Sequence, residues 1–189
     1  MQFFSSDRER RLWIWTLAVV VAIYSTLGLA TTLAATLRDN GLLGVGFFIL
    51  GCVLVLATVV THGMTTRPGG TEIAVALGVA AAYLLVFVRM AVPTERSHLV
   101  EYGVVAVFMY EAFTERASQG RRVPAPAVLA FVGTSLIGVF DECIQFVLPG
   151  RVFEWTDILF NILAASMAVA ASAALGWARR QTQRRTTQE

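Results

Sequence analysis

Residues 141–161 read DECIQFVLPGRVFEWTDILFN and connect two long apolar segments of the chain. The stretch starts near the end of one apolar segment, passes through Pro149-Gly150 and enters the next segment at Trp155. Adjacent proline and glycine are typical of a turn. We therefore predict a helix end, a turn and a helix start, with four carboxylates gathered around the turn.

The composition around this stretch is that of a membrane protein. Of 189 residues, 56% are hydrophobic and only 15% are charged, and the mean hydropathy is +0.65. A soluble domain normally carries about 25% charged residues. The net charge of +2 is too small to indicate a nucleic-acid partner.

The apolar segments predict an all-α, polytopic membrane fold with six transmembrane helices. A helix needs about 20 apolar residues to cross the hydrocarbon core of a bilayer. Six segments approach or exceed this length: Leu12–Thr36, Leu42–Thr61, Thr71–Met90, Ser97–Phe113, Ala125–Leu148 and Trp155–Trp177. The first is too long for the apolar region of a signal peptide, so we expect an uncleaved anchor.

The basic residues predict the orientation of these helices. All of them are arginines, and eleven of the 15 fall in the two terminal segments and the even-numbered loops. Because cytoplasmic loops of membrane proteins are enriched in basic residues, we predict a plasma-membrane protein with both termini in the cytoplasm.

Polar residues gather at one end of the fourth predicted span. His98, Glu101 and Tyr102 follow the spacing i, i+3, i+4, which places them on one face of a helix. This is the outer end of the span in the predicted orientation.

The next two spans carry similar groups at their facing ends. Asp141 and Glu142 lie near the end of the fifth span with Gln145 between them on the helix surface, and Asp157 and Asn161 form an i, i+4 pair at the start of the sixth. Because successive spans alternate in direction, we expect all three polar patches to lie at the same membrane face.

The carboxylates differ in whether the helix dipole and helix capping favour their positions. A charged side chain within a span costs about 2.5–3.5 kcal/mol on insertion scales, and the helix dipole disfavours Asp141 and Glu142 near a C-terminus. Asp157 and Glu154 lie at a helix N-terminus, where a capping role is a sufficient alternative. We predict that Arg151 pairs with Asp141 or Glu142, and its guanidinium could also hold a phosphate or a substrate carboxylate.

Two motifs resemble a known family. The stretch ERSHLVEYGVVAVFMY (residues 95–110), followed by DECIQFVLPGRVFEWTDILFN, is similar to the VanZ-like membrane proteins, named for an accessory glycopeptide-resistance protein. The resemblance covers roughly Glu95–Gly176. It implies a place in the bacterial cell envelope and an association with reduced susceptibility to teicoplanin-type glycopeptides.

With this resemblance, we divide the chain into three parts. Residues 1–93 form a three-helix membrane scaffold, residues 94–178 form the VanZ-like region with the polar site, and residues 179–189 form a basic cytoplasmic tail.

One hypothesis is an enzyme that acts at the outer face on a lipid-linked or cell-wall substrate. The catalytic candidates are titratable groups that could transfer a proton: His98, Glu101, Asp141 and Glu142. The substrate-binding candidates are Tyr102, Gln145, Arg151, Asp157 and Asn161. In a variant of this hypothesis, Asp141, Glu142, His98, Asp157 and Asn161 bind a divalent metal, because oxygen ligands suit Mg²⁺ or Ca²⁺ and an imidazole tolerates Zn²⁺.

Three other interpretations stay open. The polar groups could form a structural network that locks three helices together. The protein could bind membrane lipid, a cell-wall precursor or a glycopeptide without turnover, as a shielding protein. It could also be a transporter or flippase, although the polar residues gather at one face rather than near the midplane.

Overall fold

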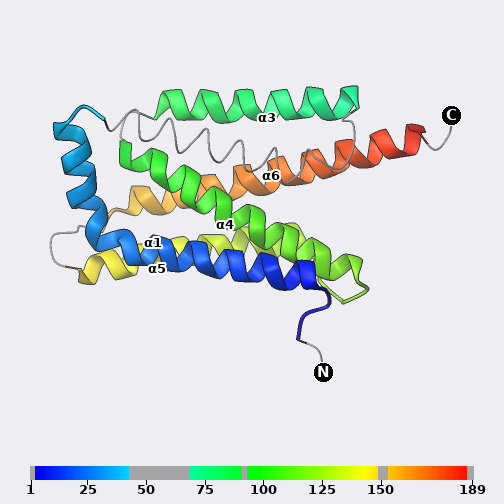
Figure 1. Cartoon of the computed structure of the whole chain (residues 1–189), viewed down its shortest axis with the longest axis horizontal. Coiled ribbons are helices and arrows are strands. Elements are labelled where there is room, and N and C mark those ends of the chain that lie inside the picture. Colours follow the sequence, from blue (N-terminus) through cyan, green and yellow to red (C-terminus); the bar gives the residue numbers. More distant parts are fainter. Residues whose placement is uncertain (1–2, 43–68, 91–92, 149–152, 187–189) are drawn as a thin grey trace. The chain divides into compact units, whose positions relative to one another are not determined.

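The described part of the chain is entirely helical where it is regular. The computed structural model describes residues 3–42, 69–90, 93–148 and 153–186 (Figure 1). Its helices are α1 Asp7–Asp39, α3 Gly70–Arg89, α4 Pro93–Ser118, α5 Pro126–Val147 and α6 Trp155–Thr186. The all-α prediction is confirmed for these residues. The predicted span Leu42–Thr61 lies, apart from Leu42, outside them.

Two helices in the described ranges are long and apolar enough to cross a membrane. They are α5 and the Trp155–Arg184 portion of α6, while Gly70–Val86 of α3 is a shorter apolar segment. α4 is not among them because its polar patch and its acidic C-terminal half lower its hydropathy. The predicted count of six spans and the predicted positions of the termini therefore stay predictions.

The ends of α5 follow from its sequence. Pro126 occupies the first turn, where its missing N–H leaves no hydrogen bond unmade. At the other end Leu148 adopts an extended backbone, the conformation favoured by a residue that precedes a proline. The helix thus ends just after the polar residues and before the predicted turn.

The chain forms two compact units, each described by itself. The first comprises Met1–Leu33 and Ser97–Ala170, and the second comprises Ala34–Arg96 and Ala171–Glu189. The first unit has a core of small and medium apolar side chains from four helices: Ile23, Val105, Ala106, Met109, Ala130, Ala165, Ala168 and Val169. The alanines permit close helix contact. In the second unit, Arg179 donates a 2.8 Å hydrogen bond to Glu72.

Within the first unit, α1 and α5 lie side by side (Figure 1). The Tyr24 hydroxyl donates a 2.9 Å hydrogen bond to the Ile137 carbonyl oxygen. Toward the N-terminal end of α1, Trp13 packs edge-on against Phe113 of α4, with ring centroids 5.1 Å apart. These contacts hold α1 against the two helices that carry much of the polar site.

An ion-pair network joins the start of α1 to the end of α4. Arg8 contacts Glu111 and Glu115 at 2.8 Å each, and Arg116 contacts Glu9 at 3.0 Å. Glu9 is 0% exposed and Glu115 is 9% exposed, so these pairs offset the cost of burying two carboxylates. The network lies at the end of α4 opposite His98.

Candidate functional site

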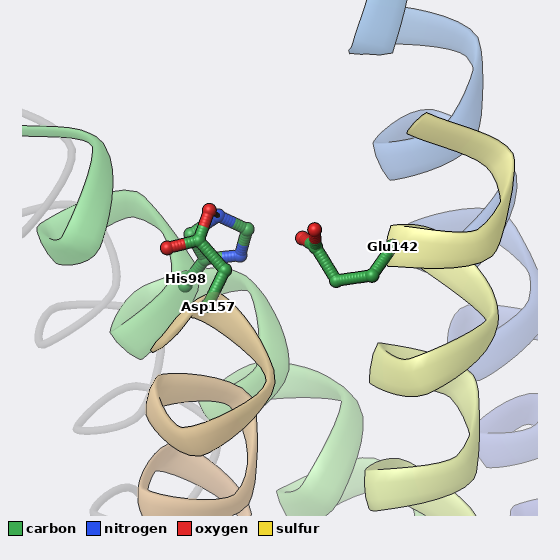
Figure 2. Close-up of side chains that lie close together, drawn as sticks. All are labelled: His98, Glu142 and Asp157. Carbon is green, nitrogen blue, oxygen red and sulfur yellow. Dashed lines mark ion pairs between the residues drawn. The ribbon is translucent and has the colours of Figure 1, made fainter. Parts of the chain in front are cut away.

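Three side chains from three helices converge in the first unit. His98 lies near the start of α4, Glu142 near the end of α5 and Asp157 in the first turn of α6, and Figure 2 shows them directed toward one another. One nitrogen or oxygen atom of each lies within 4.8 Å of those of the other two. We call this trio the His98–Glu142–Asp157 cluster.

The imidazole of His98 is buried and held from one side. Its Nε2 lies 3.4 Å from Asp157 Oδ2, and its ring stacks on Tyr102 with centroids 5.9 Å apart and an interplanar angle of 17°. The buried Nδ1 has no hydrogen-bond partner among the described residues. In Figure 2 the ring carbon between the two nitrogens is the ring atom directed toward Glu142.

The Glu142 carboxylate is fully buried and fixed by hydrogen bonds. Oε1 accepts a 3.0 Å bond from the Gln145 side-chain amide, and Oε2 accepts a 3.2 Å bond from the backbone N–H of Glu154. The Gln145 amide also donates to Asp141 at 3.1 Å. Gln145 therefore bridges the two adjacent carboxylates of α5, and the side chain of Glu154 is exposed.

Further polar groups surround the cluster. Asp141 and Tyr102 are 0% exposed, and the Tyr102 hydroxyl interacts electrostatically with Asp141. Glu101 is partly buried, and its charge acts on His98 together with that of Asp141. The site is therefore a buried, strongly acidic environment around one imidazole.

Asn161 has a different position from the cluster. It is 0% exposed, and its side-chain amide donates a 3.4 Å hydrogen bond to the carbonyl oxygen of Gly138. A Cβ atom placed on Gly138 would lie 2.7 Å from the Cβ of Asn161, so α5 and α6 touch closely here. The contact lies one helical turn from Glu142 on α5 and one turn from Asp157 on α6.

Gly138 was not among the site residues predicted from the sequence. Its signal is the i, i+4 spacing of Gly138 with Glu142, matched by that of Asp157 with Asn161. Two such pairs on facing helices allow a close backbone contact one helical turn away from a pair of polar side chains.

Not every predicted site residue can be placed. Arg151 lies outside the described residues, so its predicted ion pair with Asp141 or Glu142 stays a prediction. Among the predicted metal ligands, the structure groups His98, Glu142 and Asp157. It directs the amide of Asn161 toward a backbone carbonyl instead.

The comparison with known proteins matches most of the chain. A model of the VanZ/LLP1 family matches residues 12–176. The chain belongs to the VanZ/LLP1 family. The match begins well before the quoted motifs, so it includes most of α1 and all of α3. No curated protein and no solved structure matches the chain.

Family membership and the helices agree on the general nature of the protein. Membership of the VanZ/LLP1 family links the protein in general terms to glycopeptide resistance. The two apolar helices and the family together support a membrane protein.

Proposed function

We propose that this VanZ/LLP1 protein acts at the outer face of the bacterial plasma membrane on a lipid-linked or cell-wall substrate, and so reduces susceptibility to teicoplanin-type glycopeptides. The observation that carries the proposal is the convergence of His98, Glu142 and Asp157 from three helices in a buried site. Intramembrane ionisable groups are costly, and they commonly mark functional sites.

The proposed topology has six spans, with both termini in the cytoplasm. It rests on the arginine distribution, which favours an external connection between α5 and α6. The start of α4, the end of α5 and the start of α6 all contribute to the cluster. The cluster then faces the compartment in which cell-wall precursors are exposed.

Apolar side chains beside the cluster favour a lipid-linked substrate. Phe146 is 74% exposed and Trp155 is 65% exposed, and Phe146 packs edge-on against Phe153 with centroids 6.5 Å apart. Tryptophan residues at the ends of spans lie at the level of lipid headgroups. A lipid-linked molecule could place its headgroup at the cluster while its chain stays in the bilayer.

The proposed roles follow from the contacts. His98, Glu142 and Asp157 form the reactive centre, where groups of matched proton affinity could transfer a proton. Gln145 positions Glu142, and Asn161 sets the spacing of α5 and α6. Arg151, in the predicted turn, supplies a cation for the anionic part of the substrate.

Drug susceptibility tests this proposal. The full chain and its variants are expressed in a glycopeptide-susceptible Gram-positive host, and the inhibitory concentration of teicoplanin is measured at matched membrane abundance. We expect His98→Ala and Glu142→Gln to lose the protection that the unmodified chain confers. Glu111→Gln is the control, because Glu111 lies on α4 but pairs with Arg8 at the opposite end.

Unchanged protection in both cluster variants would rule the proposal out. A binding protein without turnover would give the same loss in these cells, so purified protein is also incubated with a lipid-linked cell-wall precursor. Release of a new product supports an enzyme, and stoichiometric retention without product supports the shielding interpretation.

A further inference from the structure

We propose that His98, Glu142 and Asp157 bind one divalent first-row transition-metal ion, of the Zn²⁺ or Mn²⁺ type. The inference rests on the proposed function only in treating this cluster as the working site. It narrows the wider ligand set predicted from the sequence to three residues that the structure brings together.

The spacing of the donor atoms is compatible with a shared metal ion. His98 Nε2 and Asp157 Oδ2 lie 3.4 Å apart. Two ligands of a tetrahedral ion with bonds of about 2.0–2.1 Å lie about 3.3 Å apart. The Glu142 oxygen, within 4.8 Å, needs to approach by at most about 1.5 Å to complete such a site.

The charge of the cluster calls for a cation. Two other buried carboxylates of the first unit have arginine partners, since Glu9 contacts Arg116 and Glu115 contacts Arg8. Among the side chains that the structure describes, no arginine forms an ion pair with Glu142 or Asp157. A buried carboxylate without a compensating cation is strongly unfavourable, and a divalent ion would compensate two of them.

The orphaned nitrogen of His98 is a second and independent observation. The residue is 6% exposed, and Nδ1 has no hydrogen-bond partner among the described residues. A buried polar atom without a partner costs about 1–3 kcal/mol. A metal ion bound to one ring nitrogen leaves the other as the N–H donor, and rotation of the whole ring can bring that donor to a neighbouring acceptor.

The groups behind Glu142 resemble the outer shell of a metal site. The Gln145 amide and the Glu154 backbone N–H each bind one oxygen of this carboxylate. Such outer hydrogen bonds orient metal ligands in proteins. One imidazole with two carboxylates suits Zn²⁺ or Mn²⁺ better than Mg²⁺, which prefers oxygen ligands alone.

A metal would also resolve a conflict of charge at the site. The surrounding carboxylates repel an anionic headgroup such as a phosphate. Three protein ligands leave at least one coordination position open, and a phosphate or carboxylate oxygen of the substrate can occupy it. The metal therefore makes an acidic site able to accept an anionic substrate.

Equilibrium binding to the purified full-length protein in detergent tests the inference. The protein is treated with EDTA, dialysed and titrated separately with ZnCl₂, MnCl₂ and MgCl₂, and bound metal is counted by elemental analysis. We expect one equivalent of Zn²⁺ or Mn²⁺ and weaker Mg²⁺ binding. Glu142→Gln and Asp157→Asn should each weaken binding at least about tenfold, while Glu111→Gln should bind as the unmodified chain does.

Cobalt provides a readout that needs no variant. Co²⁺ added to the unmodified chain should give visible absorption bands of a nitrogen- and oxygen-ligated ion, and Zn²⁺ should remove them. No bound Zn²⁺ or Mn²⁺ in folded protein would overturn the inference, as would binding that both cluster variants retain. Metal binding by Arg151→Gln but not by the unmodified chain would also overturn the inference, because Arg151 would then be the cation that compensates the carboxylates.

The two proposals can fail separately. If the protein binds no metal but Glu142→Gln still loses teicoplanin protection, the metal site is wrong and the proposed function stands. If metal binds at the cluster but protection is unchanged in its variants, the proposed function is wrong and the metal site stands.

Discussion

Gly138→Ala should separate α5 from α6 and damage the site one turn away. The added Cβ would lie 2.7 Å from the Cβ of Asn161, and ordinary contact begins at 3.4 Å, so the helices must move apart by about 0.7 Å. Overpacking of this kind costs about 1–3 kcal/mol. Because Glu142 and Asp157 lie one turn from the contact, their separation should increase by a similar amount.

The matched control is Gly103→Ala. Gly103 lies in α4 of the same unit, and a Cβ there would meet nothing within 4 Å. Both substitutions gain helix propensity of about 0.5–1 kcal/mol, so the difference between the two variants isolates the clash. Thermal unfolding in detergent, followed by circular dichroism, should place Gly138→Ala lower by about 2–4 °C per kcal/mol of difference.

The same pair has a functional readout. A misplacement of about 1 Å can cost up to about 100-fold in the rate of a reaction. Teicoplanin protection should therefore fall in Gly138→Ala and persist in Gly103→Ala at equal abundance. Equal melting temperatures in the two variants would refute the close contact, and equal protection would refute its link to the site.

Substitutions at three further positions probe other parts of the first unit. Tyr24→Phe removes the hydrogen bond to the Ile137 carbonyl and should cost about 0.5–1.5 kcal/mol in thermal unfolding, with protection unchanged. Burial raises the pKa of Glu115, but hydrogen bonds from Ser6 and Arg8 and the Arg8 charge outweigh it and hold the pKa below its usual 4.5. A depressed pKa stabilises the fold at pH values above the pKa of the unfolded state, so the melting temperature should fall as the pH drops below about 4.5. In Glu115→Gln this fall of the melting temperature toward low pH should be smaller. Gln145→Leu removes the amide that holds two buried carboxylates, so teicoplanin protection should fall sharply. Gln145→Asn keeps an amide on a shorter side chain, so its protection should lie between that of Gln145→Leu and that of the unmodified chain.

Helical spacing predicts the polar faces well but cannot choose among neighbours on them. Asp141 and Glu142 are adjacent, and they diverge by about 100° around the helix. Which of the two faces His98 depends on the rotation of α5 against α4 and α6, which the packing of the whole unit determines. The structure groups Glu142 with His98 and Asp157.

The sequence does not predict which residues distant in the chain contact one another. Glu111 pairs with Arg8 across 103 positions of the chain, and no local spacing around Glu111 indicates this partner. Similarly, the spacing that predicts Asn161 as a substrate-binding residue does not indicate its hydrogen bond to Gly138. Such pairs depend on which helices become neighbours, and local spacing carries no information on that.

The non-additivity of two cluster substitutions tests the central claim most directly. Teicoplanin protection is measured for Glu142→Gln, Asp157→Asn and the double variant at matched abundance and melting temperature. Residues that act as one centre lose their function together, so the double variant should be no worse than the more damaged single variant. Losses that simply add, or protection that survives in all three variants, would contradict a shared functional centre.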